Sequence, residues 1–212
     1  MRIALLKRTI LNKGALWLTY LKLIPSLLRL NKKSIFIDCG ANVGHISKLI
    51  SITGATIYAF EPNQIAFEIL QRRVRNKKNV IVIQKGVWHE NTSLSLFHHK
   101  DSQNNEAAFT VGSSIIQNKM NINTEKAERI EVIDLVEFIQ KLGKKISLIK
   151  LDVEGAETKI LEKIMKTKAY LLFDKMYVET HESKIPLQKK DLDVIRKEMI
   201  LKGVKNIKLN WL

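Results

Sequence analysis

The sequence predicts an α/β protein with a doubly wound, mostly parallel sheet and helices on both of its faces. Short apolar runs alternate with helical stretches between residues 34 and 209, and this spacing is typical of parallel sheets. One apolar run, residues 35–37, ends in Asp38 and leads at once into two glycines, Gly40 and Gly44. A tight strand–turn–helix of this kind indicates a ligand beyond the carboxyl ends of the strands.

The strands are predicted from apolar and β-branched runs bounded by turn residues. Residues 94–97 alternate only weakly and indicate a short additional strand. Residues 98–124 are polar and without period, so they predict a long loop, which in a compact domain is usually functional or mobile. The predicted strands are residues 34–38, 56–60, 80–84, 94–97, 146–151, 175–179 and 204–209.

The helices are predicted from the stretches that separate these strands. Pro62 suits the first turn of the helix that follows the second strand, and Glu157 suits the first turn of a later one, where its charge complements the helix dipole. The predicted helices are residues 43–51, 64–76, 134–142, 157–165 and 187–202.

Residues 1–33 form a separate basic extension, and residues 34–212 form one domain. The extension contains no acid, and its apolar run is interrupted by Lys22, Pro25 and Arg29. It is therefore too short to span a membrane, and no small-residue cleavage site follows it. Two interpretations remain open: a helical flap packed on the domain, or an amphipathic helix on a membrane surface.

The composition favours a cytoplasmic protein, either free or peripheral at the inner face of the membrane. Cys39 is the only cysteine, so an internal disulfide is excluded. The net charge of +15 would suit nucleic acid or an anionic surface. The basic residues are scattered, however, and few aromatics lie among them, which disfavours nucleic acid. The sequence indicates no oligomeric state.

The turn after the first strand indicates a cationic nucleoside ligand. Asp38 stands two residues before the first glycine, where it would repel a phosphate and attract a cation. S-adenosylmethionine, with its sulfonium and free amine, fits this position better than a dinucleotide does. Gly40 allows close approach of the backbone, Gly44 allows tight packing of the helix, and Asn42 tolerates left-handed angles.

Two further strand ends complete the predicted cofactor site. Glu61, followed by Pro62, ends the second strand 23 residues after Asp38, where a carboxylate can accept the ribose hydroxyls. The turn after the third strand contains Gly86 and Val87, whose backbone is a candidate for contact with adenine.

The predicted reaction centre follows the strand over residues 146–151. Asp152 and Glu154 are candidates for a general base that activates an acceptor hydroxyl, or for binding such hydroxyls. His181, which follows the next strand, has the right chemistry for a base near neutral pH. Glu157 is also compatible with a purely capping role. A divalent metal that uses Asp152 is left open but is not predicted, because the sequence offers no convincing second and third ligand.

These motifs together resemble the FkbM-type methyltransferases. The resemblance rests on residues 38–44, 60–63, 150–157 and 179–181, with Ser113 and Ser114 similar to the family's Ser-Ser element. It implies a class I S-adenosylmethionine-dependent fold and O-methylation of a hydroxyl, often on a sugar or natural product. Ser113, Ser114 and Glu179 are assigned to the acceptor. The class I fold usually ends in an antiparallel strand pair, but only one clear strand follows residue 187, so the sheet is either shortened there or its last strand is paired differently.

Three other functions are alternatives. A nucleic-acid methyltransferase fits the charge, but residues 152–155 lack the Asn/Asp-Pro-Pro-aromatic motif of base methylation, and three acids would repel phosphates. A non-catalytic cofactor-binding protein on a membrane surface is the second alternative. A dinucleotide oxidoreductase is disfavoured by Asp38. The sequence therefore predicts an O-methyltransferase, and it leaves the acceptor open.

Overall fold

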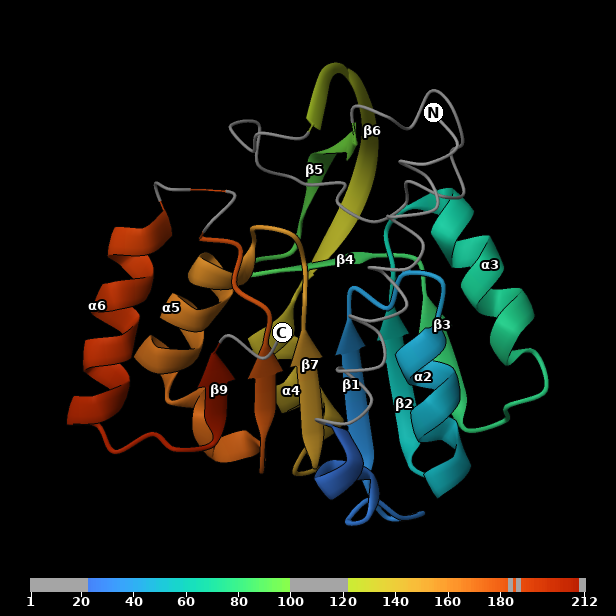
Figure 1. The fold of residues 1–212 in the computed structure, drawn as a ribbon, viewed down its shortest axis with the longest axis horizontal. Helices are drawn as coiled ribbons and strands as arrows, with labels where there is room; N and C mark the ends of the chain where they lie inside the picture. Colours follow the sequence, from blue (N-terminus) through green and yellow to red (C-terminus); the bar gives the residue numbers. More distant parts are fainter. Residues whose placement is uncertain (1–22, 100–121, 183–184, 186–187, 210–212) are drawn as a thin grey trace, which may run out of the picture.

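A doubly wound parallel sheet forms the centre of the molecule, as predicted (Figure 1). The computed structural model describes residues 23–99, 122–182, 185 and 188–209. The sheet has six strands in the order β3-β2-β1-β7-β8-β9, and all neighbours pair in parallel. These strands are β1 Ile35–Cys39, β2 Thr56–Phe60, β3 Val80–Ile83, β7 Leu148–Leu151, β8 Met176–Val178 and β9 Ile207–Leu209.

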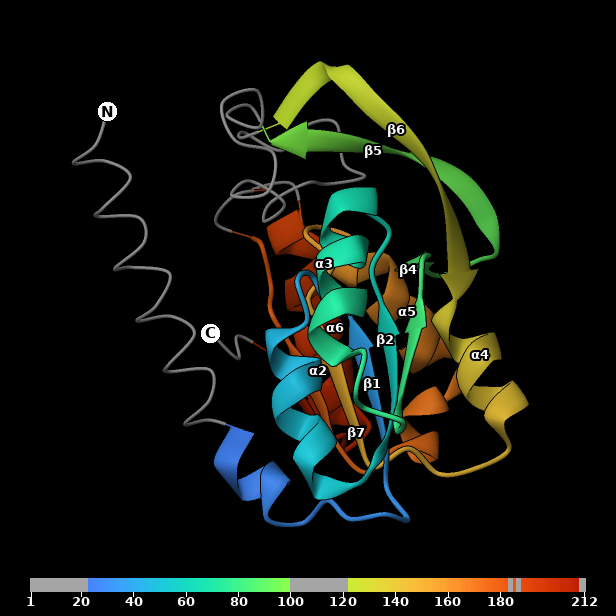
Figure 2. The same cartoon turned by 90° about the vertical axis from the view of Figure 1, so that its right-hand side faces the viewer.

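Helices cover both faces of the sheet. α2 and α3 lie on one face, α4 and α5 lie on the other, and α6 packs beside α5 (Figures 1 and 2). Their bounds are α2 His45–Ile50, α3 Gln64–Val74, α4 Leu135–Leu142, α5 Glu157–Thr167 and α6 Gln188–Leu201, with short 3-10 turns η1 Ser51–Thr53 and η4 Ala169–Leu172.

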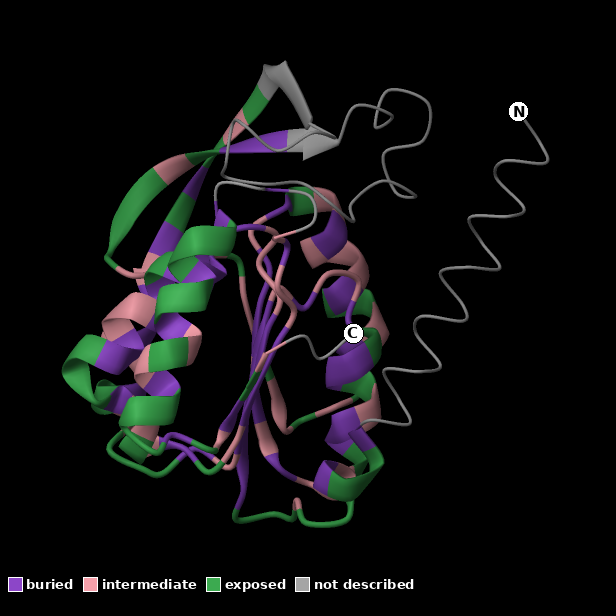
Figure 3. Cartoon of the chain, turned by 60° about the vertical axis from the view of Figure 1, so that its left-hand side comes forward, coloured by how far each residue is buried: buried purple, intermediate pink, exposed green. Residues whose placement is uncertain are grey.

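Alternating side chains of the central strands divide the core into two layers. In β1, Ile35, Ile37 and Cys39 pack with α4, α5 and α6, whereas Phe36 packs with α2 and α3. Every residue of β1 is buried, as expected for a strand covered on both faces. Figure 3 shows this buried centre, with the exposed residues on the outer sides of the helices. Asp38 therefore sits inside the protein, on the α2 face.

A second, three-stranded sheet differs from the prediction. Its order is β4-β6-β5, formed by β4 Gly86–Trp88, β5 Thr92–His99 and β6 Ile122–Asp134. β5 and β6 pair antiparallel and extend beyond the carboxyl ends of the large sheet (Figure 2). The predicted loop over residues 98–124 thus overlaps the ends of both strands. β6 was not predicted as a strand because its sequence is mostly polar.

The last described strand, β9, is paired differently from the usual antiparallel pair, which is one of the two predicted alternatives. β9 pairs with β8 in parallel, from Met176↔Ile207 to Val178↔Leu209. α6 provides the crossover between these two strands, which a parallel connection requires. Residues 210–212 lie outside the described part.

The described end of the basic extension packs on the α2 face of the sheet. Residues 23–27 are helical, Leu23 is fully buried in the core with Phe36, and Ser26 Oγ lies 3.4 Å from Tyr177 Oη. Residues 1–22, on which the flap and membrane interpretations mainly depend, lie outside the described residues. Within the described residues, no helix has the length and apolar character needed to cross a bilayer.

Candidate functional site

The carboxyl ends of neighbouring strands bring the predicted acids together. The backbone N–H of Asp152, after β7, donates to the carbonyl of Cys39 at the end of β1 (3.1 Å). The N–H of Glu179, after β8, donates to the carbonyl of Leu151 (2.9 Å). Glu61 follows β2 on the other side of β1. Acids that are far apart in sequence therefore share one edge of the sheet, as predicted from the topology.

The turn between β1 and α2 has the backbone that its residues predict. Gly40, Asn42 and Gly44 all have positive φ angles, of 78°, 50° and 82°. A Cβ on Gly40 would lie 1.9 Å from the carbonyl oxygen of Asp152, so only glycine lets the two loops meet. Gly44 permits close packing against Leu70 of α3, whereas the sequence indicated packing on the sheet.

Asp38 is contacted from within the protein, and its predicted contact with a ligand ammonium, directly or through water and backbone, stays a prediction. Its carboxylate is fully buried; Ser47 Oγ donates to Oδ2 at 2.6 Å. Lys150 Nζ lies 3.5 Å from Oδ1. Oδ1 makes no hydrogen bond within the described residues, so Asp38 helps to shape the turn through Oδ2 and adds a buried negative charge beside it.

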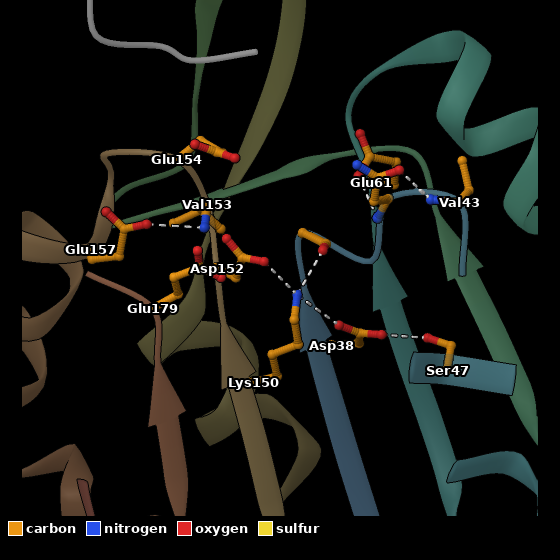
Figure 4. Close-up of polar contacts among 12 residues, drawn as sticks. Asp38, Val43, Ser47, Glu61, Lys150, Asp152, Val153, Glu154, Glu157 and Glu179 are labelled. Atoms are coloured by element: carbon orange, nitrogen blue, oxygen red, sulfur yellow. Dashed lines mark hydrogen bonds and ion pairs between the residues drawn. The ribbon is translucent and has the colours of Figure 1, made fainter. Parts of the chain in front are cut away.

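Lys150 joins the two halves of the site. Its ammonium donates to the carbonyl of Gly40 at 2.9 Å and lies 3.1 Å from Asp152 Oδ2 (Figure 4). Burial opposes its charge, but Asp152 and Asp38 outweigh burial and raise the pKa of Lys150. Lys150 thus stays protonated and fixes the carboxylate of Asp152 relative to the β1 turn.

Glu61 is held with both oxygens oriented by backbone donors. Oε2 accepts from Asn42 N–H at 2.8 Å and Oε1 accepts from Asn63 N–H at 2.9 Å. Burial raises the pKa of Glu61 to about 7, although these two hydrogen bonds oppose the shift. A carboxylate has about four acceptor sites, so each oxygen can still accept a hydroxyl. Pro62 follows at the start of the turn into α3, which Asn63 caps.

Gly86 and Val87 lie in strand β4, not in the turn that the sequence indicated. They pair with Val132 and Ile133 of β6, and Val87 is a core residue. A Cβ on Gly86 would lie 2.9 Å from the side chain of Val132. Packing between strands therefore accounts for this glycine. The predicted contact of this segment with adenine stays a prediction.

Four carboxylates surround the buried imidazole of His181. Nδ1 lies 3.0 Å from Glu157 Oε1, and Nε2 lies 3.1 Å from Glu154 Oε2. Nε2 is also 3.8 Å from Glu179 Oε1 and 4.0 Å from Asp152 Oδ1. The candidate catalytic residues Asp152, Glu154 and His181 are thus in one cluster, as the sequence predicted.

These acids change the charge state expected for His181. Burial lowers the pKa of the imidazole, but Glu154 and Glu157 outweigh burial and raise it to about 10. A general base must be unprotonated before it reacts, so this environment does not favour the free imidazole that the prediction requires. Burial and the nearby Asp152 raise the pKa of Glu179 to about 7.

Glu157 supports the loop between β7 and α5. It is 1% exposed, and its two oxygens accept from Val153 N–H (3.1 Å) and Gly155 N–H (2.9 Å). Glu154 has a positive φ of 57°, an unusual angle for a residue with a side chain. The predicted first-turn role of Glu157 is confirmed and extended, because Glu157 also holds His181.

Sequence reasoning missed Lys150, Ser47 and Asn63. The signal for Lys150 was present, since a charge inside an apolar strand has to meet a partner. The identity of that partner depends on the register between β1 and β7, which places Lys150 opposite Asp38. Ser113 and Ser114, assigned to the acceptor, lie outside the described residues.

A family model and one known protein match most of the chain. Residues 38–205 match the family model described as Methyltransferase FkbM domain. The chain is 28% identical over 166 residues to Methyltransferase 1 of Beauveria bassiana (strain ARSEF 2860), covering 71% of this chain and 66% of that protein. The chain thus spans just under two thirds of that relative.

Two solved structures are also similar. The methyltransferase FkbM from Methylobacillus flagellatus KT has a TM-score of 0.41 and 20% identity, covering 66% of this chain and 31% of that chain. Precorrin-6y C5,15-methyltransferase from Geobacter metallireducens GS-15 has a TM-score of 0.42 and 11% identity, covering 84% and 68%.

Proposed function

The chain belongs to the methyltransferase FkbM domain family, and on this premise we propose that it transfers a methyl group from S-adenosylmethionine to a hydroxyl. The acceptor is a sugar, a glycan or a small hydroxylated metabolite. The observation that carries the proposal is the contact between the turn after β1 and the acid cluster after β7. Lys150 makes this contact, through Gly40 on one side and Asp152 on the other.

The cofactor half of the site consists of the turn after β1 and the end of β2. Glu61 would accept the ribose hydroxyls, because backbone donors already orient its oxygens. Gly40, Asn42 and Gly44 shape the turn along which the cofactor would lie, beside Pro62. The adenine would lie toward Gly86 and Val87. The negative charge of these acids favours a sulfonium over a phosphate.

The acceptor half consists of Asp152, Glu154 and Glu179. Their side chains are 17–24% exposed, so they are within reach of a substrate while remaining fixed by neighbours. In the reaction, the acceptor O–H bond breaks and its proton passes to Asp152 or Glu154. The oxygen forms a bond to the methyl carbon, and the C–S bond breaks with its electron pair going to sulfur.

Lys150 and His181 place these carboxylates. Lys150 binds Asp152 Oδ2, while His181 lies among Asp152, Glu154 and Glu179. In-line methyl transfer depends strongly on the alignment of the attacking oxygen, methyl carbon and sulfur. We therefore assign His181 to positioning and to charge balance, and Asp152 and Glu154 to acceptance of the proton.

A methyl-transfer screen tests this proposal. Purified protein and cofactor carrying a labelled methyl group are incubated with sugars, lipid-linked glycans, hydroxylated metabolites and RNA. We expect label on a hydroxylated acceptor and no label on RNA bases. Asp152→Asn should retain cofactor binding and lose transfer by about 100-fold or more, whereas the surface variant Glu162→Gln should match wild type. Full activity of Asp152→Asn together with Glu154→Gln would refute the assignment of the base.

A further inference from the structure

The environment of His181 is unusual for a residue whose only role is to balance charge. Its side chain is 1% exposed. Asp152, Glu154 and Glu179 approach its Nε2 from two different loops, and Glu157 approaches its Nδ1. Among the described residues, Asp152, Glu157 and His181 form a group whose ligand atoms lie within 4.8 Å of one another, and Glu179 joins them through the 3.8 Å between its Oε1 and Nε2.

The two ring nitrogens of His181 differ in their hydrogen bonding. Nδ1 is within hydrogen-bond distance of Glu157 Oε1. Nε2 is buried and makes no aligned hydrogen bond within the described part of the chain, although it is close to three carboxylates. Glu157 is itself fixed by the N–H groups of Val153 and Gly155. The ring is therefore held by Nδ1, and Nε2 is aimed at Asp152, Glu154 and Glu179.

A histidine oriented by a carboxylate on one nitrogen, with the other nitrogen facing oxygen ligands, is typical of metal sites. Ligand atoms about 2.0–2.3 Å from an ion lie about 3–4 Å from one another. The Nε2 separations of 3.1, 3.8 and 4.0 Å from the three carboxylates fall in this range. One imidazole with several carboxylates suits Mn²⁺ or a similar divalent ion.

We propose that His181 Nε2, Asp152 and Glu179 bind a divalent cation, with Glu154 beside them and Glu157 orienting the histidine. Lys150 holds Asp152 Oδ2 at 3.1 Å, which leaves Oδ1 facing Nε2. The partly exposed carboxylates leave open coordination positions, as catalytic metal sites require.

The role of the cation rests on the proposed function. A cation at this place would bind the acceptor oxygen and lower the pKa of its hydroxyl. The proton then passes to Glu154, the oxygen attacks the methyl carbon, and sulfur takes the electron pair of the broken C–S bond. The metal takes no part in oxidation or reduction, so the step needs no further reactant.

Binding of Mn²⁺ to the full chain, stripped with EDTA and dialysed, tests the site directly. Electron paramagnetic resonance and calorimetry should show one bound Mn²⁺ per chain, with nitrogen coupling from one imidazole. His181→Gln should remove the nitrogen coupling and weaken binding at least 10-fold, and Asp152→Asn should also weaken it at least 10-fold. Glu157→Gln should weaken binding about 10–100-fold, and Glu162→Gln, on the surface, should change nothing.

Circular dichroism first establishes which variants are folded, and the nitrogen coupling is measured on wild type in any case. Absence of stoichiometric binding, or binding without nitrogen coupling, would overturn the proposal and leave His181 as an imidazolium among acids. Equal affinity of the folded His181→Gln variant would also overturn it.

Methyl-transfer assays with and without Mn²⁺ distinguish a failure of the metal proposal from a failure of the proposed function. Full transfer by metal-free protein would overturn the role of the cation while leaving O-methylation intact. Binding of Mn²⁺ without transfer to any hydroxyl would support the site and contradict the proposed function.

Discussion

Replacing Lys150 with methionine tests how the two halves of the site are held together. Methionine keeps much of the volume of lysine and removes its charge. The ammonium has three partners, at 2.9 Å (Gly40 carbonyl), 3.1 Å (Asp152 Oδ2) and 3.5 Å (Asp38 Oδ1). Asp152 is 23% exposed and can gain water, whereas Asp38 is fully buried and cannot. Most of the loss should therefore arise at Asp38.

Breaking a buried ion pair on one side costs about 3–5 kcal/mol. We expect Lys150→Met to lower the free energy of unfolding by that amount, and to shift the urea midpoint by about 2 M. Lys159→Met is the matched control, because its pair with Glu162 is exposed and is worth about 1 kcal/mol or less. Urea unfolding followed by circular dichroism measures both.

A double variant identifies the source of the loss. Asp38→Asn keeps an acceptor for Ser47 and removes the buried charge, so in the Lys150→Met background it should restore stability. Asp152→Asn in that background should restore less. The reasoning is refuted if Lys150→Met lies within about 1 kcal/mol of wild type, or if Asp38→Asn deepens the loss.

Three further outcomes are expected. Gly40→Ala should destabilise the protein by about 2 kcal/mol more than Gly203→Ala does. Both glycines have a positive φ, but only a Cβ on Gly40 would meet a backbone oxygen. Thermal unfolding of the two variants measures the difference. Asn63→Ala should cost about 1 kcal/mol by removing the cap of α3, measured in the same way. Glu61, with its pKa raised to about 7 from 4.5, binds a proton more tightly in the folded state. Its contribution to stability should therefore fall as pH rises from about 4.5 to about 7, and Glu61→Gln should lack this slope. Affinity for S-adenosylmethionine should rise over the same interval, because the ionised carboxylate accepts the ribose hydroxyls; calorimetry at several pH values checks this.

The centre of the large sheet could be predicted because strands β1, β7 and β8 are buried on both faces. Residues such as Ile35, Phe36 and Ile37 form a continuous apolar run, and Gly40 and Gly44 require a backbone that other residues rarely adopt. β4 and β6 could not be predicted in this way. β6 carries many polar residues and is defined by its pairing with β5, which depends on contacts distant in sequence.

In the site, too, the positions of the residues could be predicted from the sequence, whereas their contacts could not. Asp38, Glu61, Asp152 and His181 could be identified because each lies at or just after the carboxyl end of a strand, and parallel strands end at one edge. Their interactions depend on register and burial. Lys150 meets Asp38 only because β1 and β7 pair with that register. The acids around His181 lie in two short motifs, residues 150–157 and 179–181, but the sequence did not show that all four of them face one imidazole.

Calorimetry with S-adenosylmethionine tests the central claim most directly, because it does not depend on knowing the acceptor. The account predicts micromolar binding of one cofactor per chain, no binding of NAD, and at least a 10-fold loss in Glu61→Ala. Glu68→Ala, on the exposed side of α3, should bind as wild type does. Failure of the folded protein to bind S-adenosylmethionine, or equal binding by Glu61→Ala, would contradict the account.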